Sequence, residues 1–436
     1  MGSGGLAGKM TIDFSMTTLP KRVALLGLAL GLSAALAAAA GLGFVASVAA
    51  DPKLMDGEMI EATAGYFPNS APVWARYASH LVEERASSDE AYEVRAERAL
   101  QAAERAVRLA PGRYENWMLL AAAHELTENL PAAEKALEQA RLRAPGHVDV
   151  RWRIANLRIR AGLLPAALAD LREVVRAQET LLPQSLNLVW QAGEGRLADL
   201  EAITDETPKA RLTLARFLAQ QREHEAAANV FRALDRRRRL DWPQASGRVL
   251  NELLAAKQET LAVALWRDTI GAGPADLLWN GGFEAVAPAA LGQFDWQFGR
   301  TKYAEIGLSA DARTGRRALE IRYAGKETTR FDGELQQRFA VTPGARYRLE
   351  FFVRTENLVS PDGPRIAVLR ADTRAPLATS DPFGPGSQPW TPVALEFTAP
   401  TEMLVLALRQ TPQFSYASAT TGRVWLDDFH CEVAAR

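Results

Sequence analysis

Residues 112–145 read GRYENWMLLAAAHELTENLPAAEKALEQARLRAP, and residues 146–179 read GHVDVRWRIANLRIRAGLLPAALADLREVVRAQE. The LPAA tetrapeptides at 130–133 and 164–167 lie 34 residues apart, as do the prolines that precede the two blocks. Apolar residues within each block recur at three- and four-residue spacing, which is typical of helices with one buried face. The period and the spacing together predict consecutive helical hairpins.

The first of these blocks resembles the tetratricopeptide repeat (TPR), a two-helix unit of about 34 residues. The likeness rests on Trp117, Leu120, Ala121, Ala133, Leu137, Ala140 and Pro145. Small residues let the two helices approach closely, and large ones fill the space between successive hairpins. We therefore interpret these residues as core. The resemblance implies a solenoid whose concave face docks a peptide or protein partner.

The neighbouring copies depart from the pattern. An earlier copy starts near Trp74, with an insertion at 87–95 that we expect to lengthen its turn. In the copy from 146, Arg151 stands where the preceding copy has Trp117. Degenerate hairpins are indicated further on by Leu212, Leu214, Phe217, Ala227, Phe231, Leu250, Leu253, Leu254, Ala262, Leu265 and Trp266. Residues 51–271 are therefore expected to form one TPR-like α-solenoid domain.

An uncharged run at 23–50 follows Lys21 and Arg22. At roughly 1.5 Å per residue, a helix of this length covers the ~30 Å hydrocarbon core of a bilayer. The paired cations before the run and Asp51 after it orient the N-terminus to the cytoplasm under the positive-inside rule. The alternative is a cleaved signal peptide, because small residues end at Ala50, but an h-region usually spans only about 7–15 residues.

The resulting topology has a cytoplasmic segment at 1–20 and a transmembrane anchor at 21–50. Everything downstream would be extracytoplasmic, and the Ala- and Arg-rich composition suits a bacterial periplasm. We therefore predict a single-pass protein of the bacterial inner membrane with most of its chain in the periplasm.

The composition excludes several classes of function. The chain has 436 residues and a formal net charge of -1, whereas a dedicated nucleic-acid binder carries a strong positive footprint. Its one cysteine, Cys431, allows no intrachain disulfide, no multi-thiolate zinc site and no CxxC redox motif. Cys431 shares strand parity with Phe429 and Val433, so we predict a core-facing side chain.

The pattern of apolar and polar residues changes after a Gly- and Pro-containing linker at 272–276. Helical periodicity ends there, and segments that alternate between apolar and polar residues begin. Such segments, separated by Gly and Pro turns, predict an antiparallel β-sandwich at 277–436. The expected strands are 318–323, 333–341, 347–354, 365–370, 393–398, 403–410 and 423–433.

This region resembles the jelly-roll carbohydrate-binding modules. The resemblance rests on the opening NGGFE at 280–284, the TPGARY at 342–347, the FTAP at 397–400 and the closing LDDF at 426–429. It implies that the opening and closing motifs lie side by side. It also implies a structural calcium ion, with Glu284 and Asp428, and less directly Asn280 and Asp427, as ligands. The alternative is that Asn280 caps a turn and the carboxylates pair with nearby arginines.

Sugar recognition in a β-sandwich needs flat aromatic faces together with groups that hydrogen-bond hydroxyls. Outside the expected strand cores, the candidate glycan-binding residues are Tyr303, Arg330, Phe331, Gln413, Phe414 and Tyr416. Packing of these residues against the fold is the alternative for each. Trp279, Trp296 and Trp425 flank expected core strands and are interpreted as structural.

No catalytic residues are predicted, because no GxSxG, HExxH, phosphate-binding or dinucleotide-binding motif occurs in a suitable context. The leading hypothesis is a membrane-anchored scaffold whose solenoid docks a protein and whose jelly roll binds a glycan, in assembly or export of a surface polysaccharide. The second is a pure protein adaptor with the jelly roll as a rigid cap. A glycan-active enzyme is the third.

Overall fold

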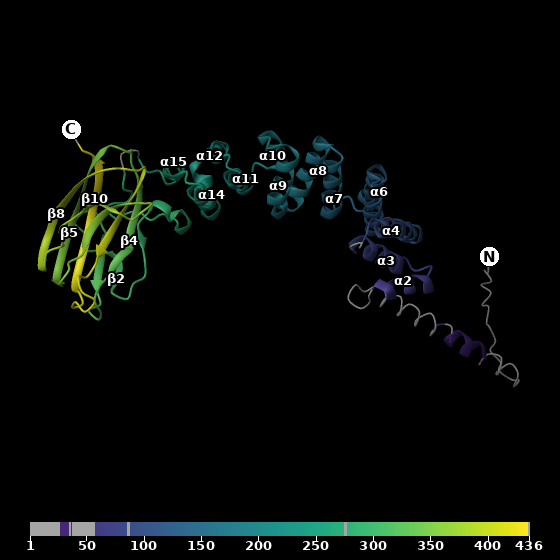
Figure 1. Cartoon of the computed structure of the whole chain (residues 1–436), viewed down its shortest axis with the longest axis horizontal. Coiled ribbons are helices and arrows are strands. Elements are labelled where there is room, and N and C mark those ends of the chain that lie inside the picture. Colours follow the sequence, from purple (N-terminus) through teal and green to yellow (C-terminus); the bar gives the residue numbers. More distant parts are fainter. Residues whose placement is uncertain (1–26, 35, 37–56, 85–87, 274–276, 435–436) are drawn as a thin grey trace, which may run out of the picture. The chain divides into compact units, whose positions relative to one another are not determined.

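The computed structural model describes residues 27–34, 36, 57–84, 88–273 and 277–434. Within them, helices occupy the chain as far as Ile270, and β-strands follow (Figure 1). The chain divides into two compact units between Val174 and Val175. The predicted order of helices followed by an antiparallel sandwich is confirmed, while the domain limits at 51–271, 272–276 and 277–436 stay predictions.

Most of the predicted membrane anchor at 21–50 lies outside the described residues. Residues 27–34 and 36 are helical and their side chains are exposed. None of the helices within the described part of the chain has the length and apolar character needed to cross a bilayer.

The first unit consists of helices joined by short turns. They are α2 (Gly57–Tyr66), α3 (Ala71–Glu83), α4 (Asp89–Leu109), α5 (Tyr114–Leu126), α6 (Leu130–Arg143), α7 (Val148–Arg160) and α8 (Leu164–Ala177), of which α8 runs past the division between the units. Buried alanines such as Ala99, Ala121, Ala133 and Ala140 line the helix contacts, with Leu137 among them. The small residues thus allow the close helix approach expected from the sequence.

The turns inside the hairpins α5–α6 and α7–α8 repeat the same backbone conformation. Glu128 and Gly162, 34 positions apart, both have a positive φ, of 55° and 76°. The N–H of the following residue bonds to the carbonyl five residues earlier, at 2.9 Å from Asn129 to His124 and at 2.8 Å in the next hairpin. This bond is the one that closes a helix ending in a left-handed residue. The 34-residue period of the sequence is therefore a period of the backbone.

A second repeated contact explains the exchange of Trp for Arg. The indole N–H of Trp117 donates to the carbonyl of Pro111 at 2.8 Å, six residues earlier. Trp74 makes the same bond to Pro68 at 3.1 Å. In the third copy, Nε of Arg151 donates to the equivalent carbonyl, that of Pro145, at 3.3 Å. A guanidinium N–H replaces the indole donor at the same point of the repeat.

The insertion in the first copy lengthens a helix more than it lengthens the predicted turn: the connection at 84–88 is two residues longer than the connection at 127–129. Helix α4 begins at Asp89 and runs for 21 residues, so most of the extra residues extend the helix. The hydroxyl of Ser88 accepts from the N–H of Ala91 at 3.2 Å and caps its first turn. Ser, Asp and Glu at a helix start favour this outcome, since they satisfy the free N–H groups there.

The second unit opens with further helices. They are the 3₁₀ turn η1 (Glu179–Leu181), α9 (Leu182–Ala192), α10 (Leu197–Ile203), α11 (Pro208–Gln220), α12 (His224–Ala233), α13 (Arg236–Asp241), α14 (Pro243–Ala255) and α15 (Glu259–Ile270). Arg222, between α11 and α12, and Lys257, between α14 and α15, again have positive φ, of 67° and 61°. Both degenerate hairpins predicted from the apolar pattern are therefore present.

Two antiparallel five-stranded sheets follow, in the orders β1-β4-β9-β6-β7 and β2-β3-β10-β5-β8. Figure 1 shows β8, β5 and β10 as long neighbouring strands. The strands are β1 (Gln297–Phe298), β2 (Ala304–Ser309), β3 (Ala318–Tyr323), β4 (Phe331–Ala340), β5 (Arg346–Val359), β6 (Arg365–Arg370), β7 (Pro376–Thr379), β8 (Gly386–Thr398), β9 (Met403–Gln410) and β10 (Thr421–Val433). All seven predicted strands are present. The short strands β1, β2 and β7 were not predicted.

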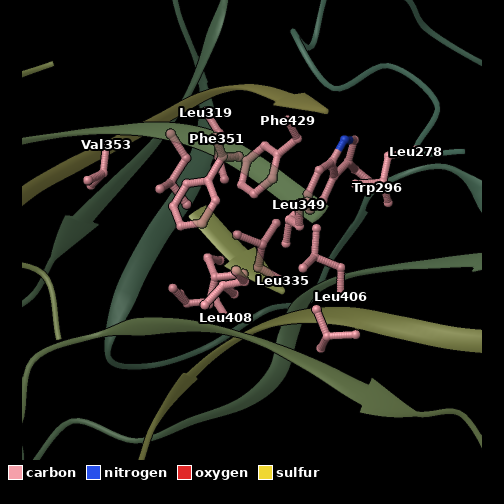
Figure 2. Packing of buried hydrophobic residues seen from close by; sticks show 14 of the residues in the cluster. Leu278, Trp296, Leu319, Leu335, Leu349, Phe351, Val353, Leu406, Leu408 and Phe429 are labelled. Atoms are coloured by element: carbon pink, nitrogen blue, oxygen red, sulfur yellow. The ribbon is translucent and has the colours of Figure 1, made fainter. Parts of the chain in front are cut away.

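The core of the sandwich lies between the sheets. Phe351 stacks on Phe429 with 4.9 Å between ring centroids, and Trp296 packs against Phe429 at 4.8 Å (Figure 2). Cys431 is buried in the same core, as its strand parity predicts. Burial raises the pKa of the Cys431 thiol to about 12, so this thiol stays protonated at neutral pH.

The last hairpin packs directly onto the start of the sandwich, within the second unit. The buried indole of Trp266 on α15 donates to the carbonyl of Leu291 at 2.6 Å, in the 3₁₀ turn η2 (Ala289–Phe294). Its ring meets Trp279 and Phe294 edge to face, with centroids 5.6 and 5.4 Å apart. The junction is therefore a continuous apolar core.

Candidate functional site

The opening motif at 280–284 and the closing motif at 426–429 lie side by side, and both form hydrogen bonds to the loop between β2 and β3. One carboxylate oxygen of Asp427 accepts from the N–H of Arg313 at 2.9 Å and from the N–H of Thr314 at 3.4 Å. The other accepts from the N–H of Asp428 at 2.8 Å. Burial raises the pKa of Asp427, while these N–H donors act in the opposite direction. Asp427 therefore serves as an anchor for backbone.

The neighbouring carboxylates hold the same loop. Asp428 accepts from the Arg313 guanidinium at 2.6 Å. Glu284 accepts from the N–H groups of Arg316 and Arg317 at 2.6 and 2.8 Å, and these bonds hold the pKa of Glu284 below its usual range. All three acidic residues named by the sequence motif thus meet on one loop.

Asn280 and Gly281 fix the opening turn. The amide of Asn280 exchanges two hydrogen bonds with the backbone of Ala285, at 2.8 and 2.9 Å, and Asn280 has a φ of 58°. The backbone of Gly281 lies against that of Phe429, whose N–H donates to the Gly281 carbonyl at 3.0 Å. A Cβ at position 281 would lie 1.9 Å from the carbonyl oxygen of Phe429. Only glycine fits there.

This donor set fits a calcium ion poorly. Calcium takes six to eight oxygen ligands, mostly carboxylates and carbonyls. Here the oxygens of Asp427 and one oxygen of Glu284 already accept from N–H donors, and a guanidinium contacts Asp428. Among the described residues, no group of three or more His, Cys, Asp or Glu side chains has an arrangement that could hold a metal. Asn280 caps its turn and Asp428 pairs with Arg313, as the alternative to a calcium site predicts. Calcium binding itself stays a prediction.

The structure corrects one predicted glycan-binding residue. Phe331 is 0% exposed and lies in the core between Tyr303 and Tyr323, with ring centroids 6.4 and 5.9 Å away. Its ring has no face free for a sugar, so the prediction for Phe331 is wrong. Tyr303 is half-buried and packs on the same core.

The remaining candidates gather at one end of the sandwich. Phe414 and Tyr416, in the loop between β9 and β10, are 55% and 80% exposed. Their rings stack on each other, with centroids 5.3 Å apart and planes at 16°. The N–H of Gln413 donates to Asp362 at 3.0 Å, and the hydroxyl of Thr328 donates to the carbonyls of Ser415 and Ala417. Two contacts from neighbouring connections therefore hold the aromatic loop.

Arg330 belongs to the same end of the sandwich. It is exposed and directly precedes β4, whose first residue, Phe331, pairs with Gln410 at the end of β9. The register thus places Arg330 beside the start of the aromatic loop. The structure brings together four of the six predicted residues, namely Arg330, Gln413, Phe414 and Tyr416.

A cavity of about 350 Å³ adjoins this loop. Gln413 forms part of its lining, together with Asp362, Arg365 and Phe383. Sequence reasoning did not single out Asp362 and Arg365. Their signal is the SPDGPR segment at 360–365, a turn sequence between two strands that carries charged residues.

The first unit holds a second cavity, of about 500 Å³. It lies on the first helices of successive hairpins, α3, α5 and α7, with Tyr92 of α4 at its side. Trp152, Arg153 and Asn156 line it with an indole ring, a guanidinium group and an amide. Arg160, which also lines it, pairs with Glu125. Arg153 is exposed and has no ion pair among the described residues.

Comparison with known proteins gives likenesses to parts of the chain. No family model matches it, and no curated protein matches it. Solved structures that are similar include a CBM4 structure (15% identity, 36% of this chain and 99% of that chain, TM-score 0.27). Others are MamA (14%, 39% and 84%, TM-score 0.29) and YrrB, described as a TPR protein with an unusual peptide-binding site (14%, 50% and 94%, TM-score 0.25).

The similar structures thus include TPR proteins for the helical part and carbohydrate-binding modules for the sheet region. Identities and TM-scores this low carry no information on the ligand of this chain.

The glycine at 281 provides a test of the clamp between the two motifs. Gly281→Ala places a methyl group against the Phe429 carbonyl, and overpacking of this kind costs about 1–3 kcal/mol or more. We expect a clearly lower midpoint in urea unfolding followed by tryptophan fluorescence. The matched control is Gly307→Ala in β2, where nothing lies within 4 Å of the added Cβ. Equal stability of the two variants would contradict the close contact.

Proposed function

We propose that the chain is a non-catalytic scaffold in which the β-sandwich binds a glycan and the helical hairpins dock a protein partner. The observation that carries the proposal is the exposed, stacked Phe414–Tyr416 pair beside a polar cavity. Single exposed rings are ordinary, whereas two exposed rings that stack on each other form a contiguous apolar patch, and such patches mark binding sites.

The surroundings of the pair suit a polyol. A pyranose offers apolar CH faces that stack on flat rings and hydroxyls that need hydrogen-bond partners. Asp362, Arg365 and Gln413 in the adjoining cavity provide a carboxylate, a guanidinium and an amide. The loop is tied down by Asp362 and Thr328, which reduces the entropy lost when a ligand binds.

Glycan binding is tested by affinity electrophoresis of the full-length chain in gels that contain one polysaccharide each. We expect retardation by at least one glycan. The double variant Phe414→Ala, Tyr416→Ala should bind about tenfold more weakly, since stacking contributes about 0.5–1.5 kcal/mol per ring. Trp242→Ala, which removes a 40% exposed ring outside the sandwich, is the control. If no glycan retards the chain, the adaptor hypothesis replaces this one.

The docking arm is proposed at the cavity of the first unit. Trp152 and Tyr92 offer aromatic surface, and Arg153 and Asn156 offer polar groups, on helices that repeat along the chain. The Tyr92 hydroxyl is held by the Leu126 carbonyl at 3.0 Å, and the Asn156 amide by the Trp152 carbonyl at 2.8 Å. A preformed surface with a few fixed polar groups suits an extended peptide segment.

Site-specific photo-crosslinking tests the docking surface. A photo-reactive amino acid in place of Arg153 should give one dominant crosslinked protein in living cells. The same amino acid in place of Leu142, a 65% exposed residue on α6 outside this cavity, should give little or none. Equal crosslinking from both positions would contradict a specific docking site.

The cellular setting is also a proposal. The uncharged run at 23–50 after Lys21 and Arg22 supports a retained inner-membrane anchor with the folded part in the periplasm. A scaffold with a protein-docking arm and a glycan-binding arm suits the assembly or export of a surface polysaccharide.

Spheroplast proteolysis tests this topology. The chain should stay in the membrane pellet at alkaline pH, and protease added to intact spheroplasts should digest it. A soluble chain beginning at Asp51 would show that the apolar run is cleaved. Protection of the chain in intact spheroplasts would contradict the periplasmic placement.

A further inference from the structure

The outer faces of the two sheets differ in how their arginines are paired. On the sheet β2-β3-β10-β5-β8, every one of the following arginines lies within 4.0 Å of a carboxylate: Arg322, Arg346, Arg348, Arg354 and Arg423. The partners include Glu305, Asp311 and Glu396. This face therefore neutralises its own charge.

The sheet β1-β4-β9-β6-β7 has a different outer face. Cross-strand register aligns Arg338 with Val405 and Leu369, and it aligns Gln336 with Ala407 and Ala367. Leu369, Val405, Ala367 and Ala407 form a small apolar cluster separate from the main core, called the apolar floor below. At one end of this floor, Arg409 of β9 aligns with Arg365 of β6.

The arginines around this floor mostly lack carboxylate partners. Arg338 and Arg365 have neither an ion pair nor a side-chain hydrogen bond among the described residues. Arg374 donates to the amide oxygen of Gln336 at 2.8 Å, over Gly333, where a Cβ would lie 2.7 Å from its guanidinium. Arg409 pairs with Asp332 at 3.0 Å, but its Nε is buried without a partner.

The nearby acidic groups do not balance these charges. Asp332 is engaged by Arg409, and Asp372 pairs with Arg370 at 2.7 Å. Glu334 and Asp362 accept from backbone N–H groups at 2.8 and 3.0 Å, and together with Asp332 they set three carboxylates against the four guanidinium groups of Arg338, Arg365, Arg374 and Arg409. The face defined by Arg338, Arg365, Arg374 and Arg409, called the arginine face below, thus carries excess positive charge in a protein whose formal net charge is -1.

We infer that the arginine face binds the carboxylate groups of an acidic polysaccharide, such as a polyuronate. This inference rests on the glycan-binding function proposed above and names the class of glycan. Planar guanidinium groups form paired hydrogen bonds with carboxylates, and they do so best when no internal partner competes. Arg365 also lines the cavity beside the aromatic loop, so one glycan chain can reach both the stacked rings and this face.

The distance between the arginines along the sheet suits an extended polysaccharide chain that carries carboxylates at intervals. Arg338 lies level with Val405 and Arg365 lies level with Arg409, four residues along β9, which is about 13 Å at the strand rise. A nucleic acid duplex carries one charge per roughly 1.7 Å and demands a denser basic surface. The few, separated arginines favour a polyuronate over a nucleic acid.

The test compares glycans and charge variants on the full-length chain. Binding to alginate, a uronate polymer, is measured by affinity electrophoresis and titration calorimetry against neutral dextran and xyloglucan. The variant Arg338→Gln, Arg365→Gln should bind alginate about tenfold or more weakly, because each lost charge-assisted contact contributes up to about tenfold. Alginate binding by the native chain should also weaken as salt is raised.

The control changes the same number of charges on the paired face. Arg322→Gln, Arg348→Gln should bind alginate within about twofold of the native chain, and thermal unfolding verifies that both variants fold. Equal loss in the two variants would overturn the inference, since net charge alone would then explain binding.

The remaining outcomes separate this inference from the function on which it rests. Binding of the native chain to a neutral glycan but not to alginate would overturn the inference of an acidic ligand and leave the proposed glycan binding intact. Tighter binding to single-stranded DNA than to alginate would assign the face to nucleic acid. The absence of binding to every glycan would overturn both proposals.

Discussion

The buried carboxylate of Asp427 ties the last strand of the sandwich to a loop near its start. It accepts from backbone N–H groups of Arg313, Thr314 and Asp428, so its charge is stabilised by oriented peptide dipoles. The close backbone contact between Gly281 and Phe429 lies beside it. An uncompensated buried carboxylate is costly, so the loop and the closing strand hold each other in place. Asp427 also lies where the pairing of β10 with β5 shifts its register, between Asp427 and His430.

The helical part depends on a different constraint, the repetition of one turn. A left-handed residue followed by a 6→1 hydrogen bond ends the first helix of four hairpins, at Glu128, Gly162, Arg222 and Lys257. The same turn recurs where the side-chain pattern has degenerated, because backbone geometry tolerates many residues there. In the second unit, Trp266 then joins the last hairpin to the sandwich through a shared apolar core.

The two faces of the sandwich illustrate how function can be separated from stability. One face pairs its arginines internally and gains little from each exposed pair. The other leaves Arg338 and Arg365 without ion pairs to any residue that the structure describes, above a small cluster of apolar residues. Together with the exposed aromatic loop and the adjoining cavity, this asymmetry gives the binding proposals their physical basis.

The sequence by itself determined the helical period, the order of helices and strands, and the burial of Cys431. These follow from local spacing, which physical chemistry links directly to secondary structure. The strands β1 and β7 escaped prediction because they span only two and four residues, whereas β2 is as long as β3 and its alternating sequence was overlooked. Phe331 was misjudged because its strand begins two residues earlier than expected, which places its side chain in the core.

Only the tertiary structure decided which distant residues share a surface. Arg338, Arg365 and Arg409 lie on three strands, and hydrogen-bonded register alone brings them onto one face. The structure likewise showed that Asp427, Asp428 and Glu284 hold backbone and arginine groups. Sequence spacing reports the direction of a side chain along one element, whereas a site requires the positions of several elements relative to one another.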